Sequence, residues 1–164
     1  MITITLKDGS KKKYEKNITV IDVAKDISEG FARNVISASF NGTTVETSTH
    51  LNKNGSLELY TWDDNEGKKA FWHSSSHVLA QALEELYPGI KLTIGPAIKN
   101  GFYYDVDLND YVISDKDFDK IESKIIDISR GKHDFKMRVV SKKDALNYYN
   151  NISNEYKTEL INDL

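Results

Sequence analysis

The chain opens with apolar and polar residues in strict alternation. Ile2, Ile4 and Leu6 are separated by threonines, Asp8-Gly9 follows, and residues 11–15 run on as a possible partner. Alternation of this kind is typical of a half-buried β-strand, and Asp-Gly between two such runs indicates a tight turn. Residues 1–15 therefore predict a β-hairpin.

A helix and further strands follow the hairpin. Thr19 and Asp22 have the spacing of a capping box, and apolar residues recur after them at helical intervals up to Gly30. Strands are predicted over residues 35–40 and 57–60, with a turn at Asn41-Gly42 after the first. One helix laid across a mixed sheet buries these half-apolar strands economically, which predicts a ubiquitin-like β-grasp domain over residues 1–62.

The pattern changes after a polar stretch at 63–69, which we take as the boundary between two domains. A long amphipathic helix is predicted over residues 70–86, up to the stop signal Pro88-Gly89. Beyond it we expect strands at 92–94, 96–98 and 102–106, a strand through Phe135, Met137 and Val139, and helices at 115–130, 142–149 and 155–164. The second domain, residues 63–164, is therefore α+β, and so is the whole chain.

Composition narrows the class of protein. The 164 residues hold 22 Lys and Arg against 25 Asp and Glu, a net charge of -3, so the bulk charge does not indicate a nucleic-acid partner, and any contact with RNA must come from local patches. No cysteine is present, which excludes disulfides. The first residues lack the features of a signal peptide, and no apolar run is long enough to span a membrane. We expect a cytoplasmic protein.

The densest chemical signal is the run from Trp72 to His77. His73 and His77 are four residues apart, so both imidazoles emerge on one face of the predicted helix. A zinc peptidase needs a glutamate directly after the first histidine, where Ser74 stands, and two histidines are too few ligands for zinc. We predict no metal site. By spacing alone, a solvated polar helix face remains the alternative.

A second cluster runs from Ile94 to Asp105. Gly95 permits a close backbone approach, and Tyr103 and Tyr104 alternate across a strand, so one of them can face a pocket. The hydroxyl of that tyrosine could bind a ligand, or its ring could pack in the hydrophobic core.

These motifs together carry a resemblance to a known family. The runs 71–80, 94–96, 101–105 and 155–160 stand in the order found in the N-terminal part of bacterial threonyl-tRNA synthetase, and the resemblance covers essentially the whole chain. It implies a TGS domain at residues 1–62 and the first, truncated part of the editing domain at residues 63–164. The family is an aminoacyl-tRNA synthetase, a ligase that attaches threonine to tRNA(Thr) with ATP. Its editing domain hydrolyses mischarged seryl-tRNA(Thr).

The resemblance also assigns roles to individual residues. His73, His77 and Lys157 match catalytic positions of the editing site, and Tyr104 and Gly95 match its substrate-binding segment. It implies that Lys157 and His73 activate the water or the ester, that His77 positions the substrate and that Tyr104 donates a hydrogen bond in the pocket.

Other parts of the family pattern are absent from this sequence. The family's Cys-x-x-x-His pair lies further along its chain, as do the synthetic core with its ATP, magnesium and zinc and the anticodon-binding domain. We therefore expect a fragment that is inactive alone and holds no cofactor of its own. Its expected partners are the acceptor end of tRNA(Thr) and the remaining synthetase domains, in a homodimeric parent without membrane or DNA contacts.

Two alternatives stay open. TGS modules also occur in guanosine-tetraphosphate synthetases and in some GTPases, so the chain could be a regulatory or RNA-binding module without catalysis. Such proteins have no reason to carry the histidine motif and the tyrosine segment behind the module, and no phosphate-binding loop is present. Alanyl-tRNA editing proteins share the histidine pattern but lack the leading TGS module.

Overall fold

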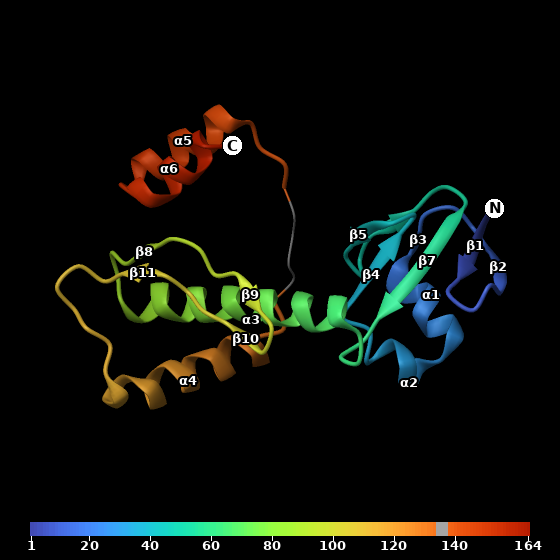
Figure 1. The fold of residues 1–164 in the computed structure, drawn as a ribbon, viewed down its shortest axis with the longest axis horizontal. Helices are drawn as coiled ribbons and strands as arrows, with labels where there is room; N and C mark the ends of the chain where they lie inside the picture. The colour runs from blue at the N-terminus through green and yellow to red at the C-terminus, as the bar shows by residue number, and fades with distance from the viewer. Residues whose placement is uncertain (134–137) are drawn as a thin grey trace. The chain divides into compact units, whose positions relative to one another are not determined.

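The computed structural model describes residues 1–133 and 138–164 and divides into two compact units, residues 1–72 and 73–164 (Figure 1). The division falls inside helix α3 (Asn65–Leu86), whose first turns belong to the first unit. Within the described residues, none of the helices combines the length and the apolar character that crossing a membrane requires.

The first unit is built on a five-stranded mixed sheet in the order β2-β1-β7-β4-β5. β1 and β7 are parallel, and the other neighbours are antiparallel. The strands of this sheet are β1 (Ile2–Leu6), β2 (Lys11–Tyr14), β4 (Ser37–Phe40), β5 (Thr43–Val45) and β7 (Gly55–Tyr60). Two short strands, β3 (Ile18–Thr19) and β6 (His50–Leu51), pair separately.

Helix α1 (Val20–Ile27) covers one face of this sheet. Its Val20 and Val23 are fully buried in one cluster with Ile4 of β1 and Leu57 of β7. Alternate residues of the strands point into this cluster, as their apolar and polar pattern requires. The predicted β-grasp arrangement and the α+β class are confirmed.

The end of the first helix differs from the prediction. The Thr19 hydroxyl accepts a hydrogen bond from the Asp22 amide at 3.2 Å, which is the expected cap. The helix ends at Ile27, before Gly30, because Ser28 is extended and its hydroxyl caps a second short helix, α2 (Glu29–Ala32). Gly30 lies inside α2, so the prediction that it ends the first helix is wrong.

The second unit combines four helical segments with short strands. β8 (Lys91–Leu92) pairs with β11 (Val106–Asp107), and β9 (Ala97–Ile98) pairs with β10 (Gly101–Phe102), both antiparallel. The remainder of α3 is followed by α4 (Asp115–Arg130), α5 (Lys142–Asn151) and α6 (Glu155–Asn162). The strands are shorter than predicted. The strand expected through Phe135 and Met137 lies outside the described residues, and Val139 belongs to neither helix nor strand.

The polar stretch at 63–69 is largely helical, so the helix predicted to start at residue 70 begins at Asn65 instead. α3 begins at Asn65 because the Asp64 carboxylate accepts a hydrogen bond from the Thr61 amide at 2.8 Å, while the Lys68 amide bonds the Asp64 carbonyl at 3.0 Å. Gly67 is buried against Thr61, where a Cβ would lie 1.9 Å from the carbonyl oxygen. The glycine therefore marks a close approach of two backbone segments.

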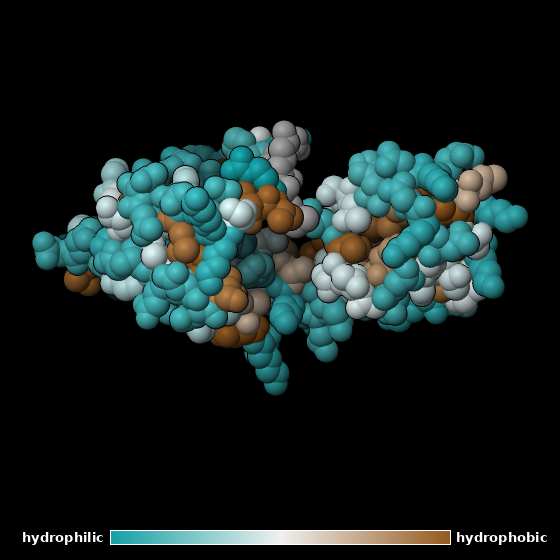
Figure 2. All heavy atoms as spheres, turned by 90° about the horizontal axis from the view of Figure 1, so that it is seen from above, coloured by the Kyte–Doolittle hydropathy of each residue, from teal (hydrophilic) through white to brown (hydrophobic). Residues whose placement is uncertain are grey.

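Apolar side chains remain exposed on the second unit. Figure 2 shows brown, hydrophobic spheres among the teal ones at the surface. Val112 is 82% exposed, and Phe118 and Tyr148 are 50% and 61% exposed. The unit therefore presents apolar surface to solvent.

We predict that Leu57→Ala lowers the free energy of unfolding of the first unit by about 2–5 kcal/mol, because it removes a fully buried side chain and leaves a cavity. Both tryptophans, Trp62 and Trp72, lie in this unit, so their fluorescence reports its unfolding in denaturant. Leu160→Ala, at a 39% exposed position of the second unit, is the matched control and should leave that transition unchanged. An unchanged midpoint for Leu57→Ala would contradict the packing.

A second prediction concerns acid. Asp117 accepts hydrogen bonds from the Tyr111 hydroxyl at 2.5 Å, the Ser114 amide at 2.9 Å and the Tyr87 hydroxyl at 3.1 Å. These bonds, that of Tyr111 above all, lower the pKa of Asp117 from 3.8 to about 2. Because the pKa is lower in the folded state, this contribution to stability is complete above pH 4 and is lost as the pH falls from about 4 to about 2.

Asp117→Asn should therefore make the second unit less sensitive to pH within that window. The measurement is an acid titration followed by the near-ultraviolet circular dichroism of the tyrosines. Identical acid transitions in the variant and the original chain would show that this carboxylate does not govern the effect.

Candidate functional site

The two histidines of α3 face one another. The Nε2 atoms of His73 and His77 are 3.2 Å apart, and their ring centroids are 4.6 Å apart at an interplanar angle of 78°. At this distance one ring donates its N–H and the other accepts it. The helical spacing thus produces the paired imidazoles that the sequence predicts.

Helix α6 brings Lys157 to the same region. Its N-cap Asn154 is buried, accepts the Lys157 amide at 3.0 Å and donates its Nδ2 to the Leu92 carbonyl at 3.3 Å. The Lys157 ammonium donates to the Thr93 carbonyl. α6 is therefore fastened to the segment that follows β8 by its cap and by the lysine itself.

Burial and nearby positive charge lower pKa values in this cluster. Burial, and after it the positive charges of His73 and Lys157, lower the pKa of His77 below its ordinary value. Burial also lowers the pKa of Lys157, against the opposing field of Glu84. Both shifts favour the neutral forms, which are the forms that can accept a proton from water.

Gly95 and Tyr104 form a wall beside this cluster. The Asp105 amide donates a hydrogen bond to the Ile94 carbonyl at 2.9 Å, which holds the two segments together at this point. A Cβ on Gly95 would lie 2.2 Å from the Tyr104 ring, so the ring packs directly on the glycine backbone. Burial, more than the nearby Glu84, raises the pKa of the Tyr104 hydroxyl, which therefore stays protonated at neutral pH.

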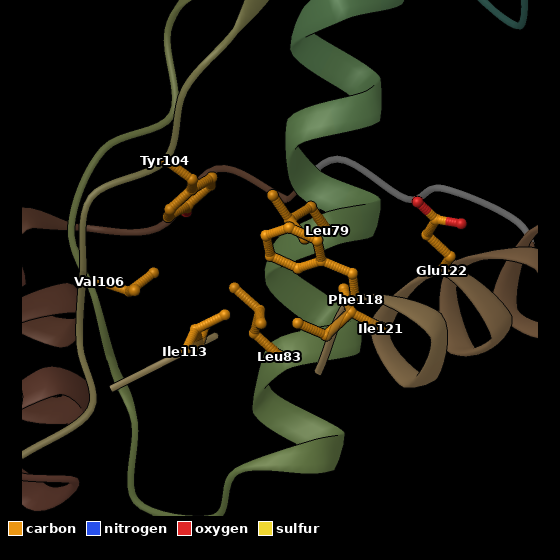
Figure 3. A pocket seen from close by; sticks show the side chains of 8 residues that line it. All are labelled: Leu79, Leu83, Tyr104, Val106, Ile113, Phe118, Ile121 and Glu122. Carbon is orange, nitrogen blue, oxygen red and sulfur yellow. The ribbon is translucent and has the colours of Figure 1, made fainter. Parts of the chain in front are cut away.

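Tyr104 also lines an apolar cavity of about 320 Å³ between α3, α4 and the β11 region (Figure 3). In Figure 3 the Tyr104 ring stands on one side of the cavity and Glu122 on the opposite side, with Leu79 and Leu83 of α3 between them. Within the described residues, Tyr104 forms no hydrogen bond with either histidine. The structure thus brings His73 and His77 into direct contact, places Lys157 where its charge acts on His77, and packs the Tyr104 ring on Gly95.

Sequence reasoning missed the residues that hold this cluster together. Ser76 is fully buried, and its hydroxyl lies 2.7 Å from the His73 carbonyl oxygen and 2.8 Å from that of Gly95. Asn154 was detectable as a cap, because it directly precedes the acidic first turn of a helix. The carbonyl of Thr93 gives no signal in the sequence.

The described residues contain no group of three or more histidine, cysteine or acidic side chains that could hold a metal ion. The histidine pair supplies two of the four ligands of a usual zinc site. The chemistry that the described cluster can perform is proton transfer and hydrogen bonding by imidazole and amine.

We predict that Gly95→Ala displaces the Tyr104 ring and destabilises the second unit by about 1–3 kcal/mol, because the new methyl group cannot fit against the ring. NMR signals of the Tyr104 ring and thermal unfolding measure the two effects. Gly30→Ala is the control, since its Cβ would meet only an ordinary contact at 3.6 Å. An undisturbed Tyr104 signal in Gly95→Ala would contradict the close contact.

Comparison with known proteins found similarity along the whole chain. Residues 2–61 match the TGS domain family. Over all 164 residues, the chain is 67% identical to the threonine–tRNA ligase of Flavobacterium johnsoniae, 65% to that of Flavobacterium psychrophilum and 48% to that of Cytophaga hutchinsonii. Every residue of the chain is covered, and the chain spans about a quarter (25%) of the length of these relatives. The chain therefore carries a TGS domain at residues 2–61 and is similar along its whole length to a quarter-length segment of threonine–tRNA ligases.

Proposed function

We propose that the chain is the N-terminal part of a threonine–tRNA ligase and that residues 73–164 contribute to a hydrolytic site that removes serine wrongly attached to tRNA(Thr). Similarity along the whole chain supports the first part. The second part depends on one observation: His77 lies beside His73 and within the field of Lys157, with the pKa values of His77 and Lys157 both lowered.

A separate hydrolytic site compensates for the weak discrimination that one binding pocket achieves between two similar amino acids. Serine lacks one methyl group of threonine, and a pocket shaped for threonine rejects it by only about 1–3 kcal/mol, or roughly 10- to 200-fold. A second pocket that admits serine and excludes threonine by size supplies the missing discrimination. Such a site needs groups that act on water and on an ester near neutral pH.

The residues present suit the hydrolysis of an ester. Water attacks the serine carbonyl carbon, the bond from that carbon to the ribose oxygen breaks, and the proton that water loses is balanced by the one that the ribose oxygen gains. In the proposed site, Lys157 and His73 activate the water or the ester and His77 positions the substrate. Tyr104, whose raised pKa keeps its hydroxyl protonated, donates a hydrogen bond in a pocket bounded by Gly95.

The proposal extends to the whole ligase. It would attach threonine to tRNA(Thr) with ATP, using magnesium and zinc bound outside these 164 residues, and would act in the cytoplasm as a homodimer. The acceptor end of tRNA(Thr) is then the ligand that residues 73–164 meet. The domain limits 1–62 and 63–164 belong to the same proposal, with the matched TGS residues ending at 61.

The test is the deacylation of serine-charged tRNA(Thr) by this chain and by a longer chain that continues through the expected Cys-x-x-x-His pair. We expect hydrolysis from the longer chain and little from the shorter one. In the longer chain, His73→Ala and Lys157→Ala should each slow hydrolysis by about 10²- to 10⁴-fold, the usual contribution of a positioned acid or base.

His50→Ala is the matched control, because His50 lies in the first unit, where its Nδ1 is 2.9 Å from the Asn17 carbonyl oxygen. Threonine-charged tRNA(Thr) should survive every treatment. If neither chain hydrolyses the serine ester, hydrolysis is refuted, and a regulatory or RNA-binding TGS module describes the chain better.

A further inference from the structure

Ser76 is a fully buried polar residue in the middle of the candidate site. It lies on α3 between the two histidines, and none of its surface is exposed. Its hydroxyl oxygen is 2.7 Å from the His73 carbonyl oxygen and 2.8 Å from the Gly95 carbonyl oxygen. A hydroxyl in this position cannot meet a substrate, so its role differs from that of the histidines.

The two acceptors of Ser76 are not equivalent. The His73 carbonyl belongs to the same helix, in the local pattern that serine often adopts. The Gly95 carbonyl lies 19 residues away in sequence, and Ser76 is its hydrogen-bond donor within the described residues. The bond to Gly95 therefore joins α3 to the segment that follows β8.

That segment also carries α6. The Leu92 carbonyl accepts from Asn154, the Thr93 carbonyl accepts from Lys157, and the Gly95 carbonyl accepts from Ser76. The helix with the histidines and the helix with the lysine are thus fastened to one short stretch of backbone. The position of α3 relative to α6 therefore depends on the hydrogen bonds that each helix forms with this stretch.

Gly95 also connects Ser76 to the tyrosine wall. A Cβ on Gly95 would lie 3.1 Å from the Ser76 hydroxyl oxygen and 2.2 Å from the Tyr104 ring. The hydroxyl, the glycine backbone and the ring are therefore in continuous contact.

We propose that Ser76 is a positioning residue, which fastens α3 to the Gly95 carbonyl and so holds the histidine pair in register with Lys157. The catalytic role of Ser76 rests on the proposed function. The positioning of α3 by Ser76 can be tested without measuring any reaction. The spacing between the two imidazoles is set by the helix, so Ser76 controls the separation of the pair from Lys157 and from the Gly95–Tyr104 wall.

The first test is an NMR titration of His77 in the 164-residue chain. The charged groups that face His77 are His73 on its own helix and Lys157 on α6. In Ser76→Ala, α3 is released from the Gly95 carbonyl, so we expect the pKa of His77 to rise toward its ordinary value. Ser74→Ala makes the same chemical change at an exposed position of the same helix and should leave the pKa unchanged. A general loss of stability does not change a pKa within the folded state.

The second test is kinetic and uses the longer chain that hydrolyses serine-charged tRNA(Thr). We expect Ser76→Ala to lower kcat about 10- to 100-fold with little change in KM, as a small misplacement of reacting groups does. If Ser76→Ala does not fold, Ser76→Cys takes its place in both tests, because it keeps a similar side chain and weakens the hydrogen bond.

The outcomes separate the two proposals. An unchanged His77 pKa together with an unchanged kcat overturns the role of Ser76 and leaves the hydrolytic function standing. A changed His77 pKa in a protein that never hydrolyses the ester supports the positioning by Ser76 and refutes the function.

Discussion

The hydrogen bonds accepted by the carbonyls of residues 92–95 determine how the second unit is assembled. β8 and β11 are only two residues long, so regular pairing satisfies little of this backbone. The side chains of Asn154, Lys157 and Ser76 supply donors to three of these carbonyls. A buried carbonyl without a hydrogen-bond partner costs about 1–3 kcal/mol. The side chains that donate to these carbonyls belong to α3 and α6, so the same hydrogen bonds also position the two helices.

This assembly explains the electrostatics of the site. An imidazole and an ammonium that lie close together repel each other when both are charged, and burial removes the water that would screen them. Desolvation, and after it the charges of His73 and Lys157, lower the pKa of His77, whereas desolvation by itself lowers the pKa of Lys157 against the field of Glu84. The contacts that build the unit thus also shift both bases toward their neutral forms.

Most elements were predictable from local pattern, and the errors have identifiable causes. Thr19 caps the first helix as predicted, and Ser114 and Ser141 directly precede two helices that begin where they were predicted, at residues 115 and 142. The start of the helix was predicted at residue 70 instead of Asn65 because the polar stretch has no apolar period. A glycine such as Gly67 in that stretch fits either a loop or a helix that packs closely on another segment. Only the packing against the Thr61 carbonyl distinguishes the two.

The sequence by itself determined the succession of strands and helix along the first unit, the starts of several helices and the placement of His73 and His77 on one helix face, because each of these depends on residues close together along the chain. Tertiary structure alone decided that Ser76 is buried and that Lys157 reaches the backbone of Thr93, 64 residues away. It also packed the Tyr104 ring against the Gly95 backbone. Contacts between distant residues follow from how the elements pack, and packing leaves no periodic pattern in the sequence.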